Sequence, residues 1–202
     1  MTWAVGLPGT IGGAVVNNAG AFGSEISRVL VMADVLTPDG EVAQVPVDWF
    51  GFRYRCSKLK GAGEQWLVLG AEFQLRPADP GDLRAKADVY SQRRQQTQPQ
   101  GRTLGSTFRN PPGDYAGRLI EAAGLKGTRC GGIVVSEQHA NFFMNVGGAT
   151  AADFRMLVER VQTAVHEQFG VLLELEIEML PEDAVRTDAV GTDAVRTDAV
   201  RT

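Results

Sequence analysis

The sequence predicts an α+β fold in which strands dominate the first half of the chain and helices are prominent in the second. Two stretches with strand character, 27–47 and 66–75, come before the first long helical pattern at 82–98. A second long helical pattern follows at 150–169 and leads into a last run of alternating apolar and charged residues. Strands and helices that are grouped in this way are typical of α+β chains.

The composition is that of a globular chain with room for one or two domains. Of its 202 residues, 44% are hydrophobic and 22% are charged, and the formal net charge is −4. The cations are scattered, so we expect no nucleic-acid partner. No apolar run approaches the ~20 residues of a membrane span, and the first residues lack the pattern of a signal peptide. We therefore expect no membrane partner and a cytoplasmic location. A monomer is also expected, although composition does not determine the oligomeric state.

The cysteines and histidines do not form a metal-binding pattern. Cys56 and Cys130 are far apart and have no CxxC spacing, so we interpret them as reduced thiols. His139 and His166 are too few for a metal centre. We expect no metal site.

The first distinctive stretch is the glycine-rich segment VGLPGTIGGAVVNNAGAFG at 5–23. Dense glycine lets backbone N–H groups converge on a phosphate or a flat ring, and Asn17 and Asn18 add hydrogen-bonding side chains. The alternative is a glycine-rich turn that packs closely on a neighbouring element. No GxGxxG pattern follows a strand here, so the sequence does not predict an ordinary dinucleotide-binding fold.

Strand patterns come next. The run at 27–47 contains the turn signal Pro38-Asp39-Gly40 and predicts a β-hairpin. The segment FRYRCSKLK at 52–60 brings several cations together, for which an exposed basic loop is the alternative interpretation. The run WLVLGAEFQL at 66–75 predicts a half-buried strand, which we expect to be central in its sheet.

Helical patterns fill much of the second half. Asp79-Pro80 interrupts the chain, and 82–98 predicts a polar, amphipathic helix that ends before Pro99, so the domain boundary is placed here. Asp114 is expected to cap a helix that stops at Gly124. A short strand is expected at 142–146.

The helix at 150–169 has the clearest signals. Thr150 and Asp153 resemble a capping box, and Gly170 is expected to end the helix. Its apolar stripe, which predicts a core-facing surface, consists of Phe154, Leu157, Val158, Val161, Val165 and Phe169.

Two segments complete the chain. The run VLLELEIEML at 171–180 predicts a last strand with Glu174, Glu176 and Glu178 on one face. Beyond Pro181 a five-residue repeat, DAVRT and its variants, suits neither a strand nor a helix, so 182–202 is expected to be a low-complexity disordered tail.

The stretch GRTLGSTFRNPP at 101–112 combines several groups that suit an anionic ligand. Gly105 allows close approach of a ligand to the backbone, and Ser106 supplies a hydroxyl. Arg109 and Asn110 add a planar cation and an amide that suit phosphate or carboxylate oxygens. The alternative is a Ser-Gly turn with a surface arginine.

Four stretches, in this order, resemble the UDP-N-acetylenolpyruvoylglucosamine reductase family of flavoenzymes. They are GLPGTIGGAVVNNAGAFGSEI (6–26), FRYRCS (52–57), GSTFRNP (105–111) with AGLKGTRCGGIVVSEQHANFFMN (123–145), and LELEIEML (173–180). The resemblance implies the second half of a FAD-binding domain of the vanillyl-alcohol-oxidase/PCMH type at 1–78. It implies an α/β substrate-binding domain at 79–181.

The resemblance also implies the reaction and its residues. FAD is the expected cofactor, NADPH the reductant and an enolpyruvyl UDP-sugar the substrate. The family's proton donor corresponds to Ser106, its arginine to Arg55 and its glutamate to Glu176, with Glu174 as the alternative. Substrate contacts are expected from Gly105, Arg109 and Asn110, with Arg109 standing where a lysine is more usual. The expected cofactor contacts are Pro8, Gly9, Thr10, Gly12, Gly13, Asn18, Ala19, Gly20 and Val68.

The sequence departs from the family pattern in two places. The interval from Arg55 to Ser106 has no room for the substrate-closing tyrosine loop of the longer family members, which implies the shorter form. In relatives, a glycine-serine-asparagine-rich loop precedes the GLPGTIGG motif, and that loop has no counterpart here. We therefore expect residues 1–202 alone to have little activity. The competing interpretations are a non-catalytic sugar-nucleotide-binding remnant and, ranked last, another oxidase with this type of FAD domain.

Overall fold

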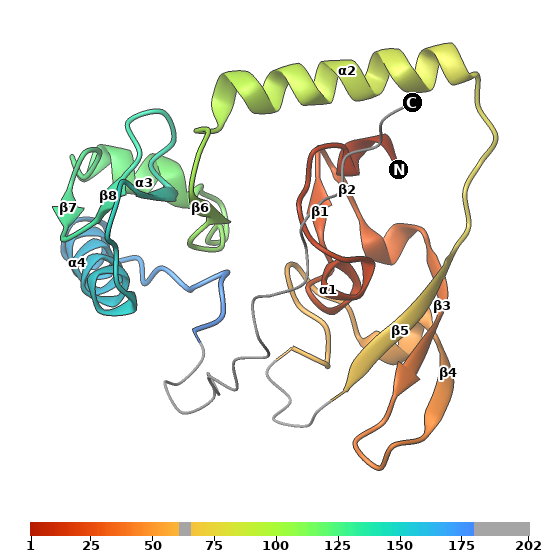
Figure 1. Ribbon diagram of the computed structural model, residues 1–202. Coiled ribbons are helices and arrows are strands. Elements are labelled where there is room, and N and C mark those ends of the chain that lie inside the picture. The colour runs from red at the N-terminus through yellow and green to blue at the C-terminus, as the bar shows by residue number, and fades with distance from the viewer. Residues whose placement is uncertain (61–65, 180–202) are drawn as a thin grey trace, which may run out of the picture.

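The computed structural model describes residues 1–60 and 66–179, so the predicted tail at 182–202 lies outside the described residues. Figure 1 shows two groups of elements joined by one long helix, α2 (Pro80–Thr97). We call the described residues before α2 the first unit and those after it the second unit. The predicted boundary near residue 79 falls at the start of α2 and remains a prediction.

The first unit is built on a three-stranded antiparallel sheet with the strand order β4-β3-β5. The predicted hairpin is confirmed, because β3 pairs with β4. The expected central position of the strand at 66–75 is wrong: β3 is central, and β5 pairs only with β3 among the described residues. Alternation shows which face a strand buries but not how many neighbours it has. The elements are η1 (Thr2–Ala4), α1 (Ile11–Val16), β1 (Gly20–Ala21), β2 (Ser24–Glu25), η2 (Ile26–Arg28), β3 (Leu30–Leu36), β4 (Val42–Pro46), η3 (Val47–Phe50) and β5 (Leu67–Phe73).

A glycine allows α1 to pack closely on this sheet. A Cβ on Gly12 would lie 3.2 Å from the carbonyl oxygen of Val68 in β5, so a larger residue would push the helix outward. The core beneath consists of Trp3, Val15, Ile26, Leu30, Ala33, Val35, Val45 and Phe50. The glycine-rich segment therefore serves in part to pack closely on a neighbouring element, which was the alternative interpretation of that segment.

The connecting helix α2 is polar, as predicted, but it has no buried residue, so the expected amphipathic character is wrong. A helix that spans two units has little core to cover along most of its length (Figure 1). It does contact the first unit: the Tyr90 ring stacks on Phe22 with 4.1 Å between centroids, and Arg94 donates to the carbonyl of Trp3 at 3.1 Å.

The second unit is a four-stranded antiparallel sheet, β6-β9-β8-β7, packed against two helices. The expected strand at 142–146 is confirmed as β9. The expected helix at 150–169 is also confirmed, with a capping box formed by Thr150 and Asp153 and with Gly170 in the left-handed region at φ 68°. Its four central apolar residues are buried in a core separate from that of the first unit. The elements are β6 (Thr103–Ser106), α3 (Ala116–Ala122), β7 (Arg129–Cys130), β8 (Ile133–Val135), β9 (Phe142–Asn145) and α4 (Ala151–Phe169).

Two expectations for the second unit are wrong. Asp114 does not cap α3, whose N-cap is Tyr115 without a side-chain cap; Asp114 instead pairs with Arg118. The run at 171–180 forms only an isolated bridge, Phe108 to Leu175, in its described part. The backbone of this run pairs with residues 107–109, and three paired residues are too few for a regular strand.

The described residues contain no helix that is long and apolar enough to cross a membrane. Over the same residues, no group of side chains could hold a metal ion, and both cysteines are free thiols, as interpreted from their spacing.

Candidate active site

The two units meet at an ion pair between predicted catalytic residues. The Nε of Arg55 donates to Oε1 of Glu176 at 2.9 Å, and its Nη2 donates to the carbonyl of Gly20 at 2.7 Å. Both side chains of the pair are about four-fifths buried, with 19% and 18% of their surfaces exposed. Arg55 has φ 53°, a conformation that non-glycine residues adopt only when the surroundings impose it. The structure therefore fixes this guanidinium firmly.

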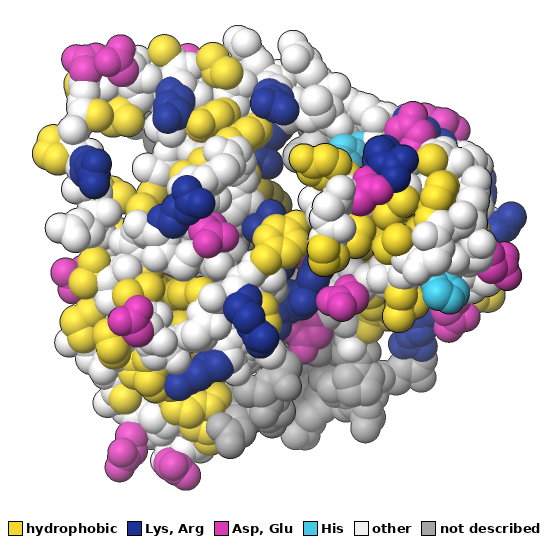
Figure 2. Space-filling model, turned by 180° about the vertical axis from the view of Figure 1, so that it is seen from behind, with side chains coloured by type: hydrophobic (Ala, Val, Ile, Leu, Met, Phe, Trp, Pro, Cys, Tyr) yellow, Lys and Arg dark blue, Asp and Glu magenta, His cyan; other side chains and the backbone are white. Residues whose placement is uncertain are grey.

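Lys60 adds a second cation that the sequence analysis placed only in a basic loop. Its Nζ donates to the backbone carbonyls of Glu176, at 3.1 Å, and Arg55, at 3.4 Å, and to Oδ1 of Asn17. Burial lowers the pKa of Lys60, and the nearby charge of Arg109 lowers it further. Figure 2 shows that Lys and Arg side chains gather where the units meet, close to acidic side chains.

Ser106 is linked to this pair by a backbone hydrogen bond of the next residue, Thr107. It is the last residue of β6 and pairs with Phe142 of β9, after a register shift in which Gly105 adopts φ 83°. The next residue, Thr107, accepts the N–H of Glu176 through its carbonyl at 2.9 Å. Ser106 is thus one residue away from a backbone partner of Glu176, which in turn pairs with Arg55.

The segment after Ser106 is held from its other side by Asn141, which the sequence analysis missed. Asn141 is 3% exposed, and its amide makes two bonds to the backbone of Phe108, accepting at 2.9 Å and donating at 2.8 Å. Its own carbonyl accepts the N–H of Thr107 at 2.8 Å. One buried side chain therefore sets the position of the loop that carries Ser106.

His139 supports Asn141 and gives this loop a pH-dependent stability. Its Nδ1 accepts the N–H of Asn141 at 3.2 Å, so the ring must be neutral there. Burial is the main cause that lowers the pKa of His139, and Lys126 contributes. The unfolded chain therefore binds more protons below about pH 6.5, and the stabilisation is present above that pH and lost as the pH falls.

We expect His139→Gln to remove part of the acid sensitivity of the protein. The free energy of unfolding of the unaltered chain should fall more between pH 7 and pH 5 than that of His139→Gln. Urea unfolding followed by circular dichroism at both pH values checks this. Parallel losses in the two proteins would contradict it.

The predicted substrate residues Arg109 and Asn110 lie on the same loop and already have protein partners. Arg109 Nη1 lies 3.6 Å from Oε2 of Glu174, whose side chain is 74% exposed. The amide oxygen of Asn110 accepts the N–H of Ala116 at the start of α3, at 3.1 Å. The two glutamates have different partners, because Glu176 pairs with Arg55 and Glu174 pairs with Arg109.

The predicted cofactor residues fall into two groups. Residues 6–10, which include Pro8, Gly9 and Thr10, form an exposed loop that leads into α1. Asn18 is 1% exposed, with its side chain bonded to Arg53 and Ser27, and Gly20 holds Arg55. Asn18 and Gly20 thus have structural roles. Of the others, Gly13 is exposed, whereas Gly12, Ala19 and Val68 are half-buried.

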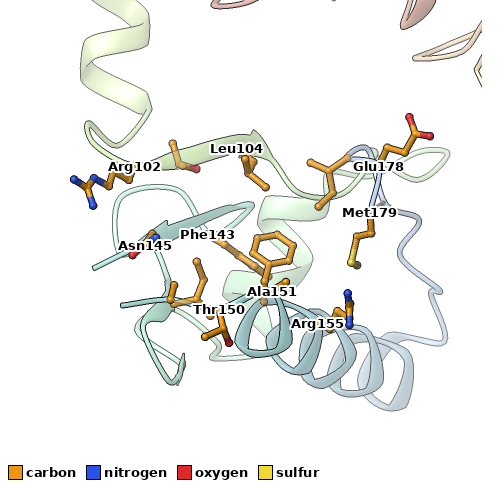
Figure 3. A pocket seen from close by; sticks show the side chains of 14 residues that line it. Arg102, Leu104, Phe143, Asn145, Thr150, Ala151, Arg155, Glu178 and Met179 are labelled. Carbon is orange, nitrogen blue, oxygen red and sulfur yellow. The ribbon is translucent and has the colours of Figure 1, made fainter. Parts of the chain in front are cut away.

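A mostly apolar cavity lies elsewhere, in the second unit. This cavity of about 440 Å³ opens between β6, β9, the start of α4 and residues 177–179 (Figure 3). Its walls are mostly apolar, with Leu104, Phe143 and Met179 among them. None of the three predicted catalytic residues lines it, so the candidate site is the polar junction and not this cavity.

Comparisons with known proteins find matches of one name. Residues 96–180 match the family model described as UDP-N-acetylenolpyruvoylglucosamine reductase, C-terminal domain. A reductase of that name from Chloroflexus aggregans is 48% identical over 183 residues, which are 89% of this chain and 62% of the relative. One from Rubrobacter xylanophilus is also 48% identical, over 90% of this chain and 61% of the relative.

A solved structure gives the same result for the fold. The crystal structure of UDP-N-acetylenolpyruvylglucosamine reductase from Thermus caldophilus matches with a TM-score of 0.79 and 34% identity, over 89% of this chain and 64% of that one. The α+β fold class is thereby confirmed, and the matched relatives are reductases by name. Residues 96–180 therefore resemble the C-terminal domain of the UDP-N-acetylenolpyruvoylglucosamine reductases, and the chain is similar to proteins of that name over about nine tenths of its length. It spans about three fifths of the length of the curated relatives it matches.

Proposed function

We propose that this chain carries the substrate-reducing site of an NADPH-dependent flavoenzyme. The reaction converts UDP-N-acetyl-3-O-(1-carboxyvinyl)-glucosamine to UDP-N-acetylmuramate, a step of peptidoglycan precursor synthesis in the cytoplasm. The observation that carries the proposal is the buried Arg55–Glu176 pair beside Ser106. The names of the matched relatives support it.

The chemistry needs a fixed cation and a proton donor. When hydride adds to an α,β-unsaturated carboxylate, negative charge develops on the carboxylate, and a preorganised cation stabilises it. Arg55 has five N–H donors, of which the bonds to Glu176 and Gly20 use two. Its remaining donors are suited to the substrate carboxylate, and Glu176 orients the guanidinium.

Ser106 is proposed to protonate the neighbouring carbon. A serine hydroxyl is a weak acid in water, but a positioned hydroxyl can deliver a proton to a strongly basic carbanion-like centre. In the structure Glu176 accepts a hydrogen bond from Arg55, so its proposed role is to orient that cation.

The residues of the first unit fit FAD. The exposed loop at 6–10 presents backbone to a ligand, Gly9 has φ 121°, and a Cβ there would meet nothing within 4 Å. Such a loop suits a pyrophosphate that approaches the backbone. Bound FAD, reduced by NADPH, would supply the hydride. Pro8, Gly9, Thr10 and Gly13 are the residues proposed to hold it.

Calorimetric titration with two sugar nucleotides tests the proposal without requiring turnover. We expect the enolpyruvyl UDP-sugar to bind about 10-fold to 100-fold more tightly than UDP-N-acetylglucosamine, because only the former offers a carboxylate to Arg55. Arg55→Met should abolish this difference. Arg53→Met, which removes an exposed cation from the same loop, should preserve it.

Equal affinity of the unaltered chain for the two ligands would refute the proposed role of Arg55. Binding that discriminates between the ligands, together with no reduction of the substrate, would favour the second candidate, a non-catalytic sugar-nucleotide-binding protein. The observation that favours this second candidate is that the chain covers only 62% of the length of the Chloroflexus aggregans relative.

A further inference from the structure

Lys60 joins three segments at the candidate site and has no assigned role. It lies in the loop that follows Ser57, and its side chain reaches the glycine-rich segment, the Arg55 turn and the last described segment of the second unit. The contact with Glu176 spans 116 positions of the sequence. Few described hydrogen bonds connect the two units, so this one is placed to affect how they meet.

The donors of Lys60 indicate which kind of role it has. A lysine ammonium has three N–H donors and no acceptor. Three oxygen atoms lie within hydrogen-bonding distance of Nζ: Oδ1 of Asn17 and the backbone carbonyls of Arg55 and Glu176. The protein can therefore use every donor of Lys60, which leaves none for a substrate oxygen.

The partner that matters most is Glu176, which is held at three points. Its N–H donates to Thr107, its side chain accepts from Arg55, and its carbonyl accepts from Lys60. The bond to Thr107 connects it to the Ser106 loop within the second unit. The other two bonds connect it to the first unit, and both depend on the 55–60 loop.

We propose that Lys60 is a positioning residue that fixes the backbone of Glu176 against the Arg55 turn. Its charge strengthens each of the three bonds, since bonds from an ammonium are stronger than neutral ones. Glu176 then meets the Arg55 guanidinium in a single arrangement. Without Lys60 the segment at 174–179 keeps its bonds to Thr107 and Arg109 but loses its backbone anchor to the first unit.

Hydrogen exchange of the whole chain tests this with Lys60→Met, which keeps most of the length of the unbranched side chain and removes its donors. Exchange of peptides that cover 174–179 should accelerate about tenfold or more, while peptides from β3 and α4 keep their rates. Lys58→Met is the matched control: its Nζ lies over the Trp49 ring, 3.1 Å from the centroid, and it should leave 174–179 unchanged.

A kinetic measurement adds a readout that rests on the proposed function. Lys60→Met should lower kcat for reduction of the enolpyruvyl UDP-sugar about tenfold and change KM by less than about threefold, because the substrate does not contact Lys60. The exchange measurement contains neither cofactor nor substrate, so it stands even if the proposed reaction fails. Unchanged exchange at 174–179, or equal acceleration throughout the chain, would overturn the inference.

Discussion

Asn141→Leu should destabilise the second unit by about 2–6 kcal/mol, because it leaves the buried N–H and C=O of Phe108 without partners, each at a cost of about 1–3 kcal/mol. Phe108 is fully buried, and Asn141 is 3% exposed, so water cannot replace the lost amide. Leucine has the same number and branching of side-chain heavy atoms, so the loss reports mainly on hydrogen bonding. The carbonyl of residue 141 still accepts from Thr107, so the loop is loosened at one point.

The distribution of tryptophan allows the two units to be followed separately. All three tryptophans, Trp3, Trp49 and Trp66, lie in the first unit, whereas α4 lies in the second. In urea, Asn141→Leu should shift the circular-dichroism transition well below the tryptophan-fluorescence transition. Asn145→Leu, which removes only an exposed bond to the Gly147 N–H, should cost less than about 1 kcal/mol. Equal losses from the two substitutions would contradict the role of Asn141.

Ser106→Ala should slow the reduction of the enolpyruvyl UDP-sugar by about 100-fold to 10,000-fold, the usual contribution of a positioned proton donor. The affinity for the substrate should change little, because the proposed carboxylate contact is to Arg55. The measurement is the rate at which substrate re-oxidises NADPH-reduced flavin, with FAD supplied in excess.

Ser106→Cys serves as the matched variant. A thiol keeps a proton-bearing group in nearly the same volume, so its rate should lie between those of the unaltered chain and Ser106→Ala. A Ser106→Ala protein that works at the unaltered rate would show that the proton comes from another group. Loss of substrate binding in Ser106→Ala would show that the residue serves recognition.

Local signals predicted the parts of the fold that local physics determines. The capping box of Thr150 and Asp153 and the turn at Pro38-Asp39-Gly40 each lie within a few residues, and both elements formed where the pattern placed them. The edge position of β5, the isolated bridge at Leu175 and the exposed α2 depend on which segments become neighbours. Alternation and helical period carry no such information.

The candidate site shows the same difference between local signals and contacts made by distant segments. Motif resemblance predicted Arg55, Ser106 and Glu176 as site residues; the structure pairs Arg55 with Glu176 and links Glu176 to Thr107, the neighbour of Ser106. The resemblance could not identify Lys60 or Asn141, because each acts through a bond to a distant backbone group. The bond of Lys60 spans 116 positions and that of Asn141 spans 33. Lys60 did stand in a basic run, but its charge alone predicts an exposed side chain.

The most direct test of the central claim is the visible spectrum of the chain titrated with FAD, then with NADPH and then with the enolpyruvyl UDP-sugar. We expect a flavin spectrum that bleaches with NADPH and recovers on addition of the substrate, with UDP-N-acetylmuramate as the product. The recovery should be slow, in line with the little activity expected of residues 1–202 alone, but faster than in the absence of the chain. A reduced flavin that the substrate re-oxidises no faster with the chain than without it would contradict the claim that Arg55, Ser106 and Glu176 form a reductase site.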